Sequence, residues 1–320
     1  MEAVLLVSAV AIGCLLAVQA AANLQLTKAV GTPYGASTLQ LWVAAGLLVV
    51  LAVLVGGLGA LTGVVEVPAW YLLGGLASPL YITSGILLFP RLGALAAGGL
   101  FVSGQMMASV ALDLSGALGV PRQPLSPGIV MGTVAVLAGI TVVIRAQRIA
   151  APVPAPVGGP PTAMPPPPTG VGPAWLLLGL LAGAVLPVQG AVNARLRSAL
   201  EEPVAVALVS FLVAALTISV VLAVLLVLRR TPGPRLPSTA MPWWGWLGGL
   251  CAAGYVTGTF LLIQAIGAAV TVALTVTGQQ AAAALVDHRG WLRLPRRPVT
   301  AGRGAGLLLL VAGSLLVQLS

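Results

Sequence analysis

Long apolar runs of similar length, separated by short polar or Pro-rich connectors, dominate the chain. A run of about 20 mainly apolar residues is long enough to cross the bilayer core as an α-helix. Helices and closed barrels are the only elements that satisfy their own backbone groups in lipid. We therefore predict an all-α integral membrane protein. Ten runs qualify as transmembrane helices, numbered here as spans one to ten: residues 4–26, 36–55, 70–90, 92–112, 127–144, 174–196, 204–228, 243–264, 267–286 and 303–319.

Polar side chains interrupt the first and sixth spans in the same way. The stretch VQAAANLQL places Gln19 and Asn23 four residues apart, so both side chains lie on one face of a helix. The stretch VQGAVNARL repeats this spacing with Gln189 and Asn193. A polar stripe on an apolar helix is expected to face a wet cavity or to hold helices together through amide hydrogen bonds. Both interpretations stay open from the residues alone.

The two stretches belong to a duplication that extends over the whole chain. In the first two spans of each half, equivalent residues are 170 positions apart, as with Gly13 and Gly183. Beyond the second span the offset becomes 174 and holds without gaps. Uncommon residue types that recur at a constant offset indicate an internal repeat. Pairs at the second offset include Tyr81 and Tyr255, Gln105 and Gln279, Asp113 and Asp287, and Gly132 and Gly306.

Each repeat holds five spans, the first within residues 1–144 and the second within residues 174–320. Residues 145–173 contain ten of the 25 prolines, which is typical of an extended tether rather than a packed segment. Because five is odd, two similar halves in series must cross the membrane in opposite directions. The predicted fold is ten transmembrane helices in two inverted five-helix repeats. Inverted repeats suit a carrier, because each copy can adopt the conformation of the other.

Composition and charge agree with this class. The chain is 59% hydrophobic and only 7% charged, whereas soluble domains carry about 25% charged residues. The net charge of +9 does not indicate nucleic acid, because the basic residues lie in short connectors, where membrane topology requires them. If the linker is cytoplasmic, only Arg122, Arg195 and Arg197 of the 15 basic residues lie outside. We therefore expect both termini on the outer side of the membrane, opposite the cytoplasm.

The motifs resemble those of a known family. Two five-helix inverted repeats are similar to the drug/metabolite transporter superfamily. The Q-x-x-x-N of spans one and six, the G-Q of spans four and nine, and the Asp that ends those helices resemble its YdcZ-like branch, here in a fused two-repeat form. The resemblance covers the chain except for the linker. It implies a carrier of small molecules in the bacterial inner membrane, possibly an exporter, with no substrate specified.

The resemblance also implies that spans one, three and four, with six, eight and nine, line the cavity. The polar residues of those spans are therefore the predicted substrate-binding residues. Amides and aromatic rings suit a neutral, zwitterionic or cationic organic solute, and the choice among these stays open. The alternative is that single amides only join helices. The predicted set is Gln19, Asn23, Tyr81, Gln105, Gln189, Asn193, Tyr255 and Gln279.

Carboxylates are scarce, which makes those present informative. Small multidrug transporters couple to protons through a Glu on the first helix, but this chain has Gln19 there. We expect Asp113 and Asp287 to act in gating or coupling, paired with connector arginines such as Arg122, Arg289 or Arg296. A plain interfacial salt bridge is the alternative. The sequence predicts no metal site and no cofactor, because the cysteines and the one histidine are isolated.

Two other kinds of function compete with the carrier. Motifs of membrane enzymes such as H-E-x-x-H, G-x-S-x-G and the P-loop do not occur, so we predict no enzyme. A lipid-flipping component or a non-transporting scaffold remains the alternative function. Glycines four residues apart in spans five and ten permit close helix packing. We expect these spans to dock on their own halves, with a homodimer as the second option.

Overall fold

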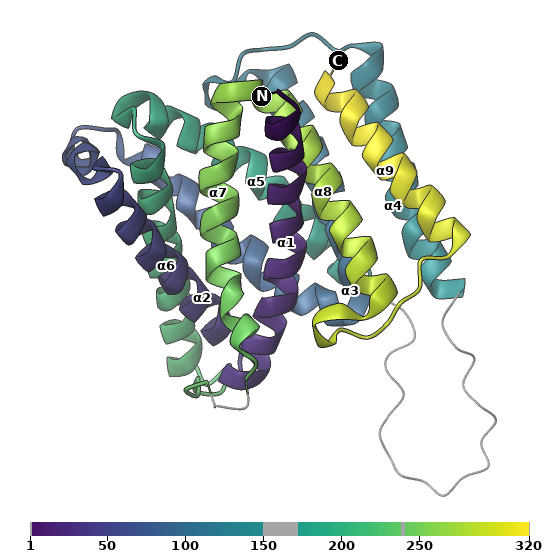
Figure 1. Ribbon diagram of the computed structural model, residues 1–320, viewed down its shortest axis with the longest axis horizontal. Helices are drawn as coiled ribbons and strands as arrows, with labels where there is room; N and C mark the ends of the chain where they lie inside the picture. Colours follow the sequence, from purple (N-terminus) through teal and green to yellow (C-terminus); the bar gives the residue numbers. More distant parts are fainter. Residues whose placement is uncertain (1, 150–171, 238–240, 320) are drawn as a thin grey trace, which may run out of the picture.

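The computed structural model describes residues 2–149, 172–237 and 241–319, which form a bundle of α-helices (Figure 1). No strand occurs within these residues, so the prediction of an all-α protein is confirmed. Short 3-10 helices η2 (Ala69–Leu76) and η4 (Trp243–Trp246) lead into α3 and α7. The α-helices are α1 (Glu2–Val30), α2 (Pro33–Leu54), α3 (Ala77–Ser115), α4 (Pro127–Ile149), α5 (Pro173–Leu200), α6 (Pro203–Val227), α7 (Leu247–Ile266), α8 (Ala268–Arg289) and α9 (Ala301–Leu319). Most of the predicted linker falls on residues 150–171, which lie outside the described residues.

Eight described stretches are long and apolar enough to cross a membrane. The longest, Ala69–Ser115, contains both the third and the fourth predicted spans. The two spans meet at Gly93, where α3 breaks. There φ is 79° and ψ is 169°, a backbone conformation that essentially only glycine adopts. The ninth predicted span corresponds to α8, which is not among these eight. Four of its polar residues are buried inside the protein: Thr271, Thr275, Gln279 and Gln280.

The duplication is visible in the backbone. Gly267, the equivalent of Gly93, separates α7 from α8 with φ 83° and ψ 161°. The turns after spans four and nine also match, since Leu118 and Leu292 have φ of 56° and 55°. Non-glycine residues rarely adopt positive φ. Two copies of such an uncommon turn indicate that both halves fold in the same way.

The two repeats pack against each other along most of their length. A Cβ at Gly13 of α1 would lie 2.0 Å from the carbonyl oxygen of Thr275 in α8. In the other repeat, a Cβ at Gly183 of α5 would lie 2.0 Å from the carbonyl oxygen of Phe101 in α3. Both glycines thus let two helix backbones approach closely. Spans one and nine therefore form the same contact as spans six and four.

The prediction for spans five and ten is confirmed only in part. These helices, α4 and α9, contact α3 and α8 of their own halves but pack mainly on each other, side by side at one edge of the bundle (Figure 1). A Cβ at Gly132 would lie 2.6 Å from the carbonyl oxygen of Gly313, and one at Gly139 would lie 2.7 Å from that of Gly306. This glycine face is occupied within the chain. It therefore offers no surface for a homodimer.

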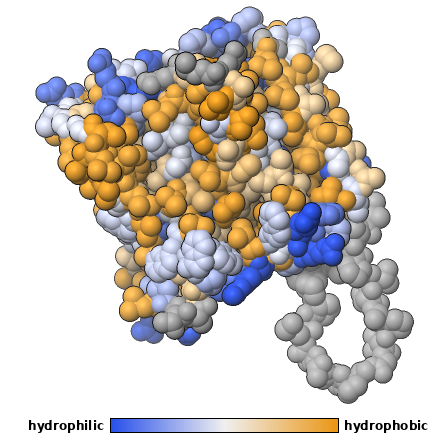
Figure 2. Space-filling model, in the orientation of Figure 1, coloured by the Kyte–Doolittle hydropathy of each residue, from blue (hydrophilic) through white to orange (hydrophobic). Residues whose placement is uncertain are grey.

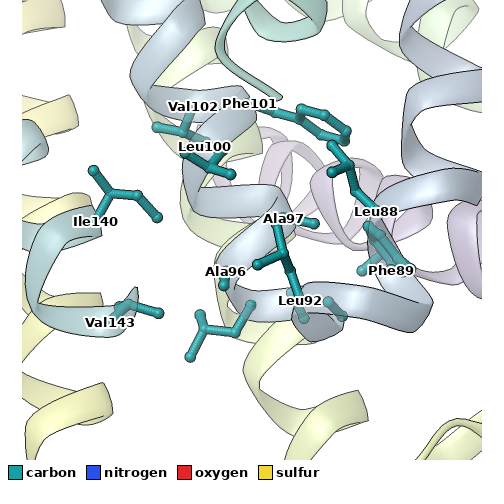
Figure 3. Close-up of a cluster of buried hydrophobic side chains, with 14 of the residues drawn as sticks. Leu88, Phe89, Leu92, Ala96, Ala97, Leu100, Phe101, Val102, Ile140 and Val143 are labelled. Carbon is teal, nitrogen blue, oxygen red and sulfur yellow. The ribbon is translucent and has the colours of Figure 1, made fainter. Parts of the chain in front are cut away.

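The largest buried cluster surrounds the break in α3. Figure 3 shows Leu88 and Phe89 before the break, Leu92 beside it and Leu100 after it, with Ile140 of α4 on the other side. Outside, apolar residues cover the middle of the visible face, and hydrophilic residues gather at its ends (Figure 2). The first turn of α1 and the last turn of α9 lie at one end of the bundle (Figure 1). We call this the terminal end and the opposite end, where α4 ends and α5 begins, the linker end.

Candidate functional site

A cavity of about 1190 Å³ runs into the bundle between the two repeats. Its wall includes Arg197 and Ser198 at the end of α5, Glu201 just after it, and residues 317–319 at the end of α9, so it opens at the terminal end. Seven of the predicted residues line it, while Asn23, Gln279 and Asp287 do not. Those that do are Gln19, Tyr81, Gln105, Asp113, Gln189, Asn193 and Tyr255.

Two cavity amides have polar atoms without partners. Gln19 is 4% exposed and Gln105 is 8% exposed. Within the described residues, neither Oε1 of Gln19 nor Nε2 of Gln105 has a hydrogen-bond partner. A buried amide without a partner is costly, so such atoms on a cavity wall are suited to a bound solute.

The equivalent amides in the second repeat are engaged within the protein. Gln189 donates to the hydroxyl of Ser78 at 3.1 Å and to that of Ser210 at 3.4 Å. Gln279 donates to the hydroxyl of Tyr81 at 3.3 Å, across the interface between the repeats. The Tyr81 ring in turn packs on Phe101, with ring centroids 4.8 Å apart. The two repeats therefore differ in what they offer to a solute.

The two predicted asparagines mainly join helices. Asn23 of α1 donates to Oε1 of Gln40 in α2 at 3.0 Å. Its own Oδ1 lies 2.0 Å from the position that a Cβ would take at Gly248. Asn193 repeats this arrangement, because it donates to Ser210 at 3.2 Å and its Oδ1 faces Gly74. Only Asn193 also touches the cavity.

Asp287 lies at the linker end, where it ties three elements together. Its carboxylate accepts hydrogen bonds from the backbone N–H of Ala94 at 2.8 Å and of Leu95 at 3.2 Å, just after the break in α3. It also forms an ion pair with Arg303 of α9, 2.7 Å apart. Both side chains are buried, 1% and 2% exposed. The carboxylate thus holds the bend of α3 against α8 and α9.

The arginine partners differ from those predicted. Arg296 and Arg122 do not pair with the aspartates but donate to the backbone carbonyls of His288 and Leu114. Arg303 was not predicted as a partner of Asp287, although it begins the tenth predicted span. Its position inside a span could have identified it from the sequence, because a charged residue within a membrane span usually has a functional partner.

A second arginine closes the same end. Arg297 donates to the carbonyl oxygen of Pro90 at 3.0 Å and to that of Arg91 at 3.3 Å. Burial lowers the pKa of its guanidinium, the nearby Asp287 carboxylate raises it, and Arg303 lowers it. The cluster of Asp287, Arg297 and Arg303 is called the linker-end cluster below. It contains two cations and one anion.

The terminal end lacks the corresponding contacts. A Cβ at Gly93 would lie 2.8 Å from Oδ2 of Asp287, whereas a Cβ at the equivalent Gly267 would meet no atom within 4 Å. Asp113, the equivalent of Asp287, is half-buried and lines the cavity. The bend of α3 is therefore docked, and the turn between α7 and α8 is not. The molecule is closed at one end and open at the other.

Comparison with known proteins decides the family. The family described as "Putative inner membrane exporter, YdcZ" matches residues 4–142 and again residues 174–316. The chain belongs to this family. The two matches coincide with the two repeats, so the chain is a fused two-repeat member. It is a multi-pass transporter of the inner membrane, of the exporter type.

Two further comparisons add the fold alone. No curated protein matches the chain. One solved structure, described as "Crystal structure of protein", is similar over 99% of this chain and 96% of its own, at 20% identity and a TM-score of 0.57. That likeness shows a shared fold and carries no information about the solute. Within the described residues, no group of three or more His, Cys, Asp or Glu side chains lies close enough to hold a metal ion.

Proposed function

We propose that this family member is a secondary carrier that moves a small organic solute by alternating access. The supporting observation is that the linker end and the terminal end differ, although the two repeats otherwise match. The linker end is held by the linker-end cluster, while the equivalent Asp113 and Gly267 are apart. If the repeats exchange conformations, the terminal end closes and the linker end opens.

The solute binds midway, where both repeats contribute. Gln19 and Gln105 supply the unpaired acceptor and donor. Tyr81 and Tyr255 supply aromatic surface on opposite repeats and line the same cavity. Gln189, Gln279 and the two asparagines position the helices around this site through their hydrogen bonds. Asp287 and Asp113 act as gates at opposite ends.

The linker end faces the cytoplasm. Basic connectors favour the cytoplasmic side of a membrane, and the linker end carries Arg91, Arg297 and Arg303. In this orientation both termini lie outside and the structure is an outward-open state. Export is then completed from this state, when the solute leaves Gln19 and Gln105 for the outside.

Accessibility from each side tests alternating access. Ser109 lines the open cavity, and its equivalent Ala283 is 1% exposed at the closed end. Ser109→Cys and Ala283→Cys are made in a background of Cys14→Ala and Cys251→Ala, since the other repeat carries alanine at both positions. Ala97→Cys, at a core position, is the unreactive control.

Membrane-impermeant thiol reagents are then added to either side of oriented proteoliposomes. We expect Ser109→Cys to react only from the terminal side and Ala283→Cys only from the linker side, both within one preparation. A scaffold would leave Ala283→Cys unreactive. A channel would let Ser109→Cys react from both sides, and either result contradicts the carrier.

A further inference from the structure

The charged residues at the two ends of this carrier differ, although the repeats that form these ends are alike. Three charged side chains line the cavity at the terminal end: Asp113, Glu201 and Arg197. Carboxylates outnumber guanidinium groups there by one. An anionic solute is therefore repelled at the open mouth and a cationic one is retained.

The cavity at the linker end follows from the repeat, and this step rests on the proposed exchange of conformations. Asp113, Gln123, Ser126 and Ile129 line the present cavity. Their equivalents in the second repeat are Asp287, Arg297, Thr300 and Arg303. Two neutral positions of the outer mouth are therefore arginines at the inner one. Lys28 and Arg145, the equivalents of the lining residues Ser198 and Leu319, add two further positive charges.

Membrane topology alone does not explain these arginines. The positive-inside rule is satisfied by exposed connector residues, such as Arg296. Arg303 is instead 2% exposed, and its Nε is without a hydrogen-bond partner in the part of the chain that the structure describes. Burying a guanidinium with an unpaired N–H is costly. A ligand that accepts this hydrogen bond would remove that cost.

Opening of the linker end releases further donors. Arg297 now donates to the carbonyl oxygens of Pro90 and Arg91, in the bend of α3. When that bend moves away from the cluster, the Arg297 guanidinium loses both acceptors. Two guanidinium groups then share the single carboxylate of Asp287 in a partly desolvated site. Guanidinium groups bind the two oxygens of a carboxylate, sulfonate or phosphate well.

We propose that the solute is an organic anion, which Arg297 and Arg303 bind from the cytoplasm and which the outer mouth, bearing Asp113 and Glu201, releases. The anionic group docks on the two arginines. The apolar or aromatic body of the solute lies between Tyr81 and Tyr255, and its neutral polar groups reach Gln19 and Gln105. The difference in charge between the mouths lowers the affinity of the outward-open state for the anion and so speeds its release, while the direction of net movement follows the gradient of the solute.

The sign of the potential in each cavity is the first test. The Ala283→Cys and Ser109→Cys variants are titrated with a sulfonatoethyl and a trimethylammonioethyl methanethiosulfonate, which carry opposite charges. We expect the ratio of anionic to cationic reagent rates to be about tenfold higher for Ala283→Cys. Arg303→Ile, the residue of the other repeat, should lower that ratio, whereas Arg296→Leu at an exposed connector position should not.

If Arg303→Ile does not fold, positive charges added at the outer mouth test the same point. Gln123→Arg with Ile129→Arg gives the outer mouth the residues of the inner one, and it should raise the ratio measured at Ser109→Cys. Equal ratios for the two probes would overturn the proposal while leaving alternating access intact. Ala283→Cys that reacts with neither reagent would instead contradict the carrier itself.

Binding of matched solutes is the second test. Thermal unfolding of the purified protein is followed with benzenesulfonate, benzenesulfonamide or benzyltrimethylammonium, which share a ring and differ in charge. A ligand that binds the folded state raises the unfolding temperature. We expect the sulfonate to raise it most, and Arg297→Gln to abolish that difference. Stabilisation by the sulfonate that is no greater than by the other two would overturn the proposal.

Discussion

The carboxylate of Asp287 lies against Gly93, on the far side of the repeat interface, and fills the space that a Cβ would need there. The separation between that Cβ position and Oδ2 is 2.8 Å. The equivalent approach of Asp113 to Gly267 is absent from the described structure, since a Cβ at Gly267 meets nothing within 4 Å. This one difference distinguishes the closed end from the open end, and the first prediction follows from it.

Gly93→Ala and Gly267→Ala form a matched pair. Both glycines have backbone angles that only glycine adopts readily, so each substitution should cost about 1–3 kcal/mol of stability. Only Gly93→Ala also displaces the Asp287 carboxylate and so loosens the linker end. We expect Ala283→Cys to react faster in the Gly93→Ala background than in the Gly267→Ala background. Equal rates would show that the Gly93 contact does not hold that end closed.

Removal of one charge from the buried ion pair should be costly. Asp287→Asn leaves the Arg303 guanidinium buried without its carboxylate, and breaking a buried pair typically destabilises a protein by about 3–5 kcal/mol. Asp113→Asn, at the half-buried equivalent, should cost far less, because no ion pair in the described chain involves it. Thermal unfolding of the two variants measures the difference. Similar unfolding temperatures would contradict a structural role for the pair.

The cavity amides should matter for transport more than for stability. Gln19→Leu with Gln105→Leu removes two amides whose Oε1 and Nε2 respectively lack partners within the described chain, so folding should be retained. Gln105→Leu with Gln279→Leu should likewise abolish flux with normal expression. Efflux of the solute from proteoliposomes and the unfolding temperature are measured together.

A matched control separates binding from packing. Asn23→Leu, which is outside the cavity, removes the hydrogen bond to Gln40 and places a branched chain against Gly248, so it should lower the unfolding temperature. Normal flux in the Gln19→Leu, Gln105→Leu variant would remove both residues from the site.

The glycine face between α4 and α9 should be required for folding of the single chain. Gly139→Val would place a side chain 2.7 Å from the carbonyl oxygen of Gly306, and overpacking of this kind costs about 1–3 kcal/mol. Gly304→Val, whose Cβ would meet only an ordinary contact at 3.9 Å, is the control. The unfolding temperature should fall for Gly139→Val alone. A change of oligomeric state with unchanged stability would favour an intermolecular role instead.

Several residues that line the cavity could be predicted from the repeated sequence. Gln19, Tyr81, Gln105, Gln189 and Tyr255 were predicted from polar residues at corresponding depths, and all of them line the cavity. Their spacing along single helices was sufficient for this, because helix periodicity fixes which side chains share a face. Asn23 and Gln279 belong to the same pattern but contact neighbouring helices instead. Sequence periodicity does not distinguish a face toward water from a face toward another helix.

The sequence by itself determined the membrane class, the spans and the inverted duplication, because those depend on local apolar length and on residue identity at fixed offsets. Only the tertiary structure decided which partner each repeated residue has. Asp113 and Asp287 are the same residue type at equivalent positions, yet one lines a cavity and the other is buried against Arg303. The physical reason is that the partner of a side chain depends on how the helices pack in three dimensions, which equal residues at equivalent positions do not determine.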